Sequence, residues 1–293
     1  MTFLIIHHPD IAKHDEASAV GGLAAGRIEA VVAAVVGVEG VQEVRAKPVA
    51  REALGRVHTE GYLDALDAWD AEVGHNEVME LDMDTHVNAH TLRAAMLSVG
   101  AAVQGVEAVV AGVARHVVCP VLAGHHAGPD TAEGFCVLNA AAVAALHAKA
   151  LGKRVAVLDF DTHSGNGTIA ALEGVEGVMV VETYQAGYPG PVEVHGGNVL
   201  RALVGGPDTW RAVWESYLRQ VAAFGAEVLV VSAGFDGHRD DPLGRIGLDD
   251  GDFEGLFEGI KALGVPTVAV LEGGYNVPTT ARLARRWVEV MGL

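Results

Sequence analysis

Short apolar runs rich in β-branched residues recur along the chain and constrain its fold more than any other feature. These runs are continuously apolar rather than alternating, which is typical of strands buried on both faces of a sheet. They cover Phe3–Ile6, Val117–Leu122, Val155–Phe160, Val178–Val181, Val228–Val231 and Val265–Leu271. A sheet covered on both faces is usually parallel, because its crossover connections place helices on those faces.

Segments with helical periodicity lie between these runs. The clearest is Leu92–Ala111, where apolar residues recur at three- and four-residue steps, and Ala140–Ala150 and Trp210–Phe224 are further candidates. The alternation predicts an α/β fold with three layers around a central, mostly parallel sheet. We find no repeat, low-complexity segment or linker, so we predict a single domain over residues 1–293.

The charge of the chain bears on its partners. The formal net charge is −18, which argues against a nucleic-acid-binding surface, because phosphate contacts need clustered Lys and Arg. The same charge is compatible with a cationic substrate and equally with plain solubility.

The sequence carries no signal for export or for a membrane. The N-terminal MTFLIIHHPD has no basic region followed by a long apolar core, and the apolar stretch 94–113 is interrupted by Gln104 and Glu107. Cys119 and Cys136 are too few for a disulfide framework. We expect a soluble, cytoplasmic protein that does not contact membranes, and the oligomeric state stays open.

Polar residues follow several of the predicted strands. His125 and His126 come after the run at 117–122, and Tyr275 comes after the last run. The run at 155–160 ends in DFDTH, and Asp241 lies in the loop after the run at 228–231. In open α/β sheets, ligands bind beyond the carboxyl ends of the strands. The sequence therefore predicts a functional site at this edge of the sheet.

The stretch DFDTH indicates a metal site. Asp159, Asp161 and His163 are two residues apart, so an extended chain points all three side chains to one face. Crowded carboxylates resist burial unless a cation lies between them. Asp161 and His163 with Asp241 as third ligand would suit zinc, and also iron(II), cobalt or manganese. Asp159 would then accept a hydrogen bond from a neighbouring imidazole. The alternative is that these are capping and turn residues.

The tandem histidines and Tyr275 are candidates for proton transfer and hydrogen bonding. One imidazole of His125-His126 could act as general base toward a metal-bound water, while a carboxylate holds the other in a different protonation state. Tyr275 follows Gly273 and Gly274, and its phenol could donate a hydrogen bond to a developing oxyanion.

Four motifs in order resemble the zinc-dependent histone deacetylase and acetylpolyamine amidohydrolase family, which has an arginase-like α/β fold. They are GHHAGPDTAEGFCVLN (124–139), VLDFDTHSGNGT (157–168), SAGFDGHRDDPLG (232–244) and LEGGYN (271–276). The resemblance runs from about His58 to Asn276. It implies zinc-dependent hydrolysis of an acetylated amine to acetate and a free amine.

The resemblance also implies residue roles. Asp161, His163 and Asp241 match metal ligands, His126 the general base, and Tyr275 the oxyanion donor. The residues that match supporting and substrate-binding positions are His125 as electrostatic partner, Asp159 beside it, Asn166 in contact with His126, Phe135 and Tyr188 as the aromatic walls of the substrate tunnel, and Gly134 and Gly274 as flanking backbone positions.

The chain departs from the family pattern at several places, two of which bear on the site. Ser164 stands where the family usually has a second histidine, and VVETYQAGYPG (180–190) lacks the usual Ser-Leu-His-like run. A structural monovalent cation therefore stays open. The substrate also stays open among protein acetyl-lysine, acetylated polyamines and other small acyl-amines.

Two other functions are compatible with such a fold. A binuclear manganese ureohydrolase would need a further histidine and more paired carboxylates at the strand ends. A non-catalytic protein could bind an acylated amine without turning it over, although the set of candidate ligands, His126 and Tyr275 argues against an inactive site.

Overall fold

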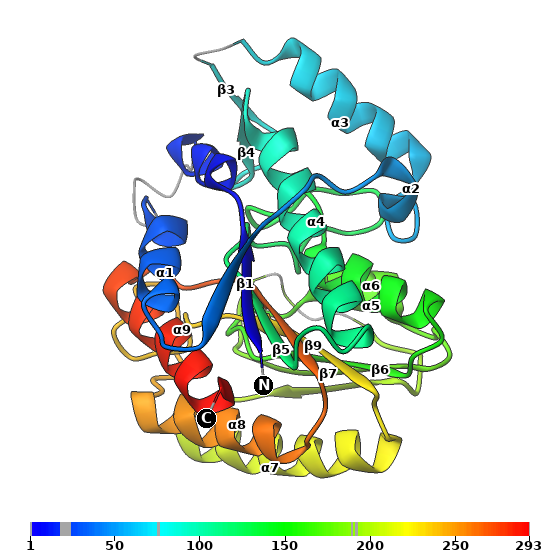
Figure 1. Ribbon diagram of the computed structural model, residues 1–293. Helices are drawn as coiled ribbons and strands as arrows, with labels where there is room; N and C mark the ends of the chain where they lie inside the picture. Colours follow the sequence, from blue (N-terminus) through cyan, green and yellow to red (C-terminus); the bar gives the residue numbers. More distant parts are fainter. Residues whose placement is uncertain (1, 18–24, 75–76, 189, 191–192, 293) are drawn as a thin grey trace.

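A central parallel sheet organises the computed structural model, which describes residues 2–17, 25–74, 77–188, 190 and 193–292 (Figure 1). Its eight strands run in the order β2-β1-β5-β10-β9-β6-β7-β8, and every neighbouring pair is parallel. The strands are β1 (Phe3–His7), β2 (Val41–Arg45), β5 (His116–Cys119), β6 (Val155–Asp159), β7 (Val178–Tyr184), β8 (Val199–Leu203), β9 (Val228–Ala233) and β10 (Thr267–Leu271). Strands β3 (Val78–Glu80) and β4 (His86–Asn88) form a separate antiparallel pair.

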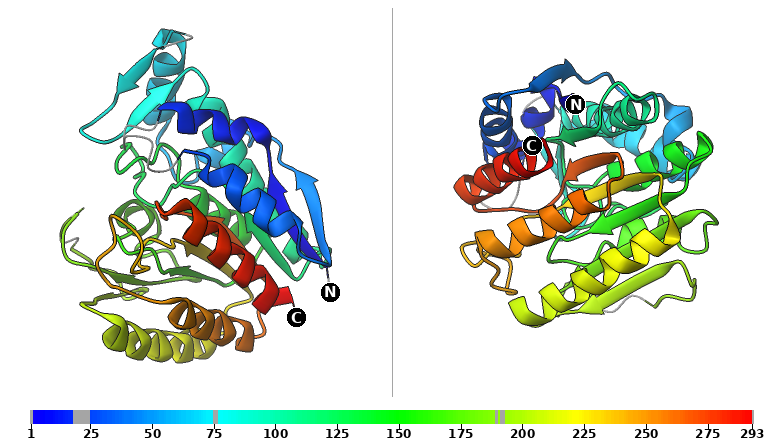
Figure 2. Two further views of the ribbon diagram at one scale, coloured as in Figure 1. Left: turned by 90° about the vertical axis from the view of Figure 1, so that its left-hand side faces the viewer. Right: turned by 60° about the horizontal axis from the view of Figure 1, so that its bottom comes forward.

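Helices cover both faces of the sheet, as predicted. The helices α1 (Arg27–Val36), α7 (Pro207–Phe224), α8 (Asp250–Ala262) and α9 (Val277–Gly292) pack in succession on one face. The opposite face carries α2 (Arg51–Leu54), α3 (Glu60–Glu72), α4 (Thr91–Val110), α5 (Ala140–Ala150) and α6 (Asn166–Leu172), and a 3-10 helix spans Pro9–Ala17. Figure 2 shows the resulting layers. The predicted α/β class with a central parallel sheet is therefore confirmed.

All six predicted strands are present, and the two edge strands were missed. Strand β2 reads VQEVR and has an exposed or half-buried position at every residue, and most of β8 is likewise only partly buried. Edge strands lack cover on one side, so they need no continuous apolar run. Strand β5 ends at Cys119, before the predicted Leu122, because Pro120 cannot donate a ladder hydrogen bond.

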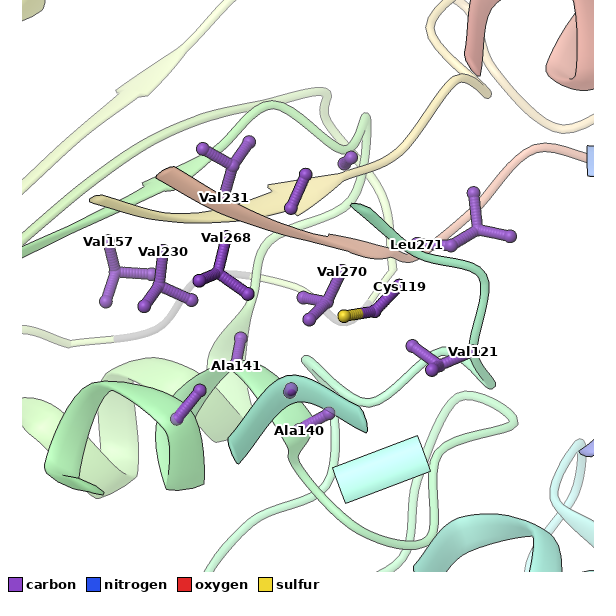
Figure 3. Packing of buried hydrophobic residues seen from close by; sticks show 14 of the residues in the cluster. Cys119, Val121, Ala140, Ala141, Val157, Val230, Val231, Val268, Val270 and Leu271 are labelled. Atoms are coloured by element: carbon purple, nitrogen blue, oxygen red, sulfur yellow. The ribbon is translucent and has the colours of Figure 1, made fainter. Parts of the chain in front are cut away.

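Small side chains let the helices of the second layer approach the sheet closely. Ala140 and Ala141 of α5 face Val157, Val230 and Val268 of the central strands (Figure 3). On α4, a Cβ added to Gly105 would lie 2.9 Å from Val268 Cγ1. The core is therefore closely packed, with small residues on the helices against branched residues on the strands.

Helix α4 is the one helix among the described residues that is long and apolar enough to cross a membrane. The apolar window extends over Gln104 and Glu107, so these residues do not exclude a span by composition. However, 67% of that window is buried inside the protein, and α4 packs on α5, β1 and β5. Its apolar character is thus explained by its place in the core.

His58 forms hydrogen bonds that hold the loop carrying the tandem histidines. Its Nδ1 lies 2.9 Å from Gly128 O, and Asn139 N donates to its Nε2 at 3.1 Å. The ring must be neutral to donate with one nitrogen and accept with the other. Burial lowers the pKa of His58 to about 4, despite the bond to Gly128.

The depressed pKa of His58 predicts acid destabilisation of this loop. The unfolded chain binds a proton near pH 6.5, so His58 stabilises the fold fully above pH 6.5 and progressively less as the pH falls toward about 4. The shift corresponds to at most about 3 kcal/mol. In urea titrations between pH 7 and 4, His58→Gln should lose less stability on acidification than the wild type. The same change in the free energy of unfolding with pH in both proteins would contradict this role.

Candidate metal centre and active site

Four neighbouring strands deliver polar residues to one edge of the sheet. Strands β5, β10, β9 and β6 are adjacent in that order and parallel. Their carboxyl ends therefore meet, and they lead into His125-His126, Glu272–Tyr275, Asp236 and Asp159–His163. The predicted convergence at the strand ends is what the structure shows.

Three of these side chains form a group that can hold a metal ion. Ligand atoms of Asp161, His163 and Asp236 all lie within 4.8 Å of one another. His163 Nδ1 is 2.9 Å from Asp236 Oδ2 and 3.2 Å from Asp161 Oδ1. Backbone amides hold both carboxylates in place, since His163 N donates to Asp161 Oδ1 and Thr162 N donates to Asp236 Oδ1.

The chemistry of this group fits a divalent cation. Asp236 Oδ2 is buried and has no hydrogen-bond partner of acceptable geometry, although His163 Nδ1 is close. A buried carboxylate oxygen of this kind is costly unless a cation is bound. Two carboxylates and one imidazole form a donor set that zinc accepts, and iron(II) or cobalt can take the same ligands.

Burial and the neighbouring charges shift the ionisation of this group. Burial raises the pKa of Asp236 to about 6, and the charge of Asp161 adds to that effect. Burial disfavours the charged ring of His163, but its bonds to Asp161 and Asp236 outweigh burial and raise its pKa to about 10. A cation bound here would displace that proton, because a ligating imidazole is neutral.

The structure does not bring Asp241, the predicted third ligand, into this group, and it places Asp236 there instead. Both oxygens of Asp241 are occupied by backbone amides: Oδ1 accepts from Leu243 N at 3.0 Å, and Oδ2 accepts from Tyr275 N at 2.7 Å and Asn276 N at 3.1 Å. Asp241 thus braces the loop that carries Tyr275. The available signal was distance from the strand, since Asp236 lies three residues after β9 whereas Asp241 lies eight after it.

The tandem histidines have different partners. His125 Nδ1 lies 3.0 Å from Asp159 Oδ2, and His126 Nδ1 lies 2.7 Å from Asn166 Oδ1. Burial alone would lower the pKa of His125, but the carboxylates of Asp159 and Asp161 outweigh it and raise the pKa well above its ordinary value. Burial and the charge on His125 hold the pKa of His126 well below its ordinary value. The pair therefore combines a charged ring with a neutral one.

The predicted aromatic residues border a cavity of about 250 Å³ beside this group. His126, His163 and Tyr275 are among its lining residues, and so are Gly134, Phe135 and Tyr188. The rings of Phe135 and Tyr275 lie edge to face with centroids 6.1 Å apart. Burial, with the charges of Asp236 and Asp161, raises the pKa of Tyr275 well above its ordinary value, so its phenol stays a donor.

The two glycines of the predicted substrate site act differently. Gly134 has a φ of 58°, and a Cβ there would lie 2.4 Å from His126 Cδ2, so the position permits the close approach of the histidine ring. Gly274 has a φ of 137°, and a Cβ there would collide with Thr280 Oγ1 at 2.5 Å. Gly274 is not among the residues that line the cavity, so its place is in the turn before Tyr275.

Glu272 is a buried site residue that the sequence analysis did not single out. Its Oε2 accepts from Gly124 N at 2.6 Å and His125 N at 3.1 Å, so it fixes the backbone of the tandem histidines. The guanidinium of Arg27 contacts the carbonyl of Glu272. Burial raises the pKa of Glu272 to about 7. Its position directly after β10 was the available signal.

A second buried carboxylate explains the serine at position 164. Ser164 Oγ donates to Glu182 Oε1 at 2.9 Å, and Gly165 N donates to Glu182 Oε2 at 2.8 Å. Arg201 lies against both, with its Nε 2.9 Å from Glu182 Oε1 and a terminal nitrogen 2.9 Å from Ser164 Oγ. Glu182 is 1% exposed. The ion pair therefore anchors the loop between His163 and Asn166.

Comparisons with known proteins agree with the fold. The sequence model of the family described as "Histone deacetylase domain" matches residues 23–291. Histone deacetylase 15 of Arabidopsis thaliana is 32% identical over 267 residues, which cover 85% of this chain and 48% of that protein. An acetylpolyamine amidohydrolase of Burkholderia pseudomallei is 37% identical over 215 residues, which cover 68% of this chain and 62% of that protein.

Solved structures show the same architecture over almost the whole chain. The HDA15 HD domain matches with a TM-score of 0.89 and 26% identity, covering 99% of this chain and 88% of that one. An acetylpolyamine aminohydrolase from Burkholderia pseudomallei matches with a TM-score of 0.88 and 26% identity, covering 99% of both chains. The chain therefore has the same fold as the HDA15 HD domain and the Burkholderia aminohydrolase. The chain belongs to the histone deacetylase family. It spans about half the length of the Arabidopsis relative and less than two thirds of the Burkholderia amidohydrolase.

The two assignments for the third ligand predict different metal contents. After loading with zinc and extensive dialysis, Asp236→Asn should lose the metal, because one of three ligands is weakened. Asp241→Asn should keep it, and should lower turnover through the displaced Tyr275 loop. Metal analysis of both proteins checks this. Stoichiometric zinc in Asp236→Asn together with loss in Asp241→Asn would restore Asp241 as the ligand.

Proposed function

We propose that the chain is a metal-dependent amidohydrolase that cleaves an N-acyl amine into a short carboxylic acid and a free amine. The observation that carries the proposal is the pairing of His125 and His126 with different partners beside the Asp161–His163–Asp236 group. When bound, a divalent cation, with zinc the best match to the donor set, supplies Lewis acidity to the amide carbonyl and to the attacking water. The Asp161, His163 and Asp236 side chains would hold it.

Proton transfer in this proposal belongs to His126. Its Nδ1 is engaged by Asn166, so its Nε2 is the nitrogen that accepts the proton of the attacking water. The same proton then passes to the leaving nitrogen as the C–N bond breaks. His125 stays charged beside Asp159, which keeps His126 a weak enough base to release its proton again.

Tyr275 stabilises the charge that develops on the carbonyl oxygen. Its phenol borders the cavity together with His126 and His163, and its pKa is raised, so it donates a hydrogen bond rather than carrying charge. Asp241 accepts from the Tyr275 amide at 2.7 Å and so fixes the backbone that carries the phenol. Phe135 and Tyr188 flank the aliphatic part of a bound substrate.

Two carboxylates at or beside the cavity favour a cationic acyl-amine. Asp84 lines the cavity, as does the exposed side chain of Arg245, and Glu133 lies beside the cavity in contact with Tyr188. With a net charge of −18, the chain also attracts cations at long range. The relatives are named as acetylpolyamine amidohydrolases and histone deacetylases. An acetylated polyamine and a peptidyl acetyl-lysine both present an acylated aliphatic amine, and we propose substrates of this class.

Within the described residues, the structure gathers one metal-ligating group of three residues. That arrangement supports a single cation and gives no support to a binuclear ureohydrolase.

A deacylation screen tests the proposed reaction. The zinc-loaded protein should release acetate from an acetyl-lysine peptide, acetylputrescine or another acetylamine, and a zinc chelator should abolish the release. Metal-replete protein that hydrolyses none of these amides would overturn the proposal, as would activity that resists the chelator.

Replacing Tyr275 with Phe removes one hydrogen bond and leaves the ring in place. We expect kcat to fall about 100- to 1,000-fold, as for other oxyanion donors, while zinc stays bound. Steady-state kinetics with metal analysis on the same preparation check this. Unchanged turnover would remove Tyr275 from the reaction.

A further inference from the structure

Glu133 stands in a tight turn that fixes it next to the candidate general base. Glu133 and Cys136 exchange two backbone hydrogen bonds, at 3.1 and 2.9 Å. The two residues between them, Gly134 and Phe135, both have positive φ, at 58° and 68°, as a type I′ turn requires. A phenylalanine in the left-handed region costs on the order of 1 kcal/mol. Such a cost is maintained only where the surrounding structure determines the turn.

The Glu133 carboxylate joins two residues of the site. Its Oε2 accepts from Asn166 Nδ2 at 2.8 Å, and its Oε1 accepts from the Tyr188 hydroxyl at 2.9 Å. Asn166 Oδ1 in turn lies 2.7 Å from His126 Nδ1. The Tyr188 ring stands edge-on to the His126 ring, with centroids 5.6 Å apart. Four side chains therefore form one chain of hydrogen bonds from the cavity wall to His126.

The carboxylate determines the direction of this chain of hydrogen bonds. An ionised carboxylate only accepts, so Asn166 must turn its NH₂ toward Glu133 and its oxygen toward His126. A nitrogen that faces an amide oxygen must carry the proton, which leaves Nε2 of His126 with its lone pair. Without Glu133, the Asn166 amide could turn over and satisfy the opposite tautomer equally well.

We propose that Glu133 is a positioning residue that sets the tautomer of His126 through Asn166. The same carboxylate holds the Tyr188 hydroxyl, so the wall of the cavity and the orientation of the base depend on one side chain. This inference rests on the proposed amide hydrolysis for its kinetic consequence, but the tautomer of His126 can be observed without turnover.

Swapping the carboxylate of Glu133 and the amide of Asn166 between the two positions tests the proposal. Glu133→Gln can donate toward Asn166, which permits the Asn166 amide to turn over. Adding Asn166→Asp restores an acceptor-only group beside His126, and the amide introduced by Glu133→Gln can donate to that carboxylate. The control is Asp130→Asn, which removes an exposed carboxylate three residues earlier in the same loop.

Two readouts are needed on the zinc-loaded full chain. Nitrogen-15 spectra of labelled histidine, assigned with His126→Gln, should show the Nδ1-protonated ring in the wild type and in Asp130→Asn. Glu133→Gln should gain the Nε2-protonated form and lose about tenfold or more in kcat, which is part of the roughly 100- to 10,000-fold contribution of a general base. The double variant should recover the Nδ1-protonated ring and a large part of kcat.

Two results would overturn the assignment. One is a His126 tautomer that stays unchanged in Glu133→Gln, whether or not kcat falls. The other is a double variant that recovers neither the Nδ1-protonated ring nor kcat. If the wild type hydrolyses no acyl-amine, the proposed function fails, and the spectra still decide whether Glu133 sets the tautomer. Thermal unfolding and zinc content of each variant show whether it is folded and loaded.

Discussion

The crowding of buried carboxylates at the strand ends is the constraint on which the rest of the structure depends. Asp159, Asp161, Asp236 and Glu272 are each at most 1% exposed, and all four follow or end neighbouring strands. Water cannot solvate these charges, so the protein must compensate them. Charged His125, backbone amides and a divalent cation are the means that the geometry offers. The catalytic proposal follows from the same arrangement, because the buried carboxylates keep His125 charged, and the charge on His125 helps to keep His126 neutral.

The fold could be predicted because its central strands are buried on both faces. Strands β6, β9 and β10 are completely buried and read as uninterrupted apolar runs. Strands β2 and β8 escaped prediction because an edge position removes that pattern. Helix α9 was missed as well. Its apolar side chains form one face that lies against α1 and α8, so its helical periodicity was readable in the sequence.

The candidate site residues that could be predicted are those that follow the end of a predicted strand. Asp161, His163, His126 and Tyr275 each follow a strand end and meet in the structure. Asp241 was predicted in place of Asp236 because both aspartates lie in one loop. The shorter distance of Asp236 from β9 favoured Asp236, and the fold shows that Asp236 lies against His163. Glu182 and Arg201 could not be found from sequence, because an ion pair between two strands depends on strand register. The partners of Glu133 are likewise separated from it by 33 and 55 residues.

The order of the strands has a consequence for how the chain acquires its structure during synthesis. Strand β10 comes last among the strands in the sequence, yet it lies in the middle of the sheet, between β5 and β9. Until it is in place, a nascent chain holds two half-sheets with unpaired inner edges, which are prone to associate with other chains. The same strand leads into Glu272, which accepts from Gly124, 148 residues earlier. Closure of the sheet and assembly of the site are thus one late event, and a ribosome pausing before residue 267 would leave both unfinished.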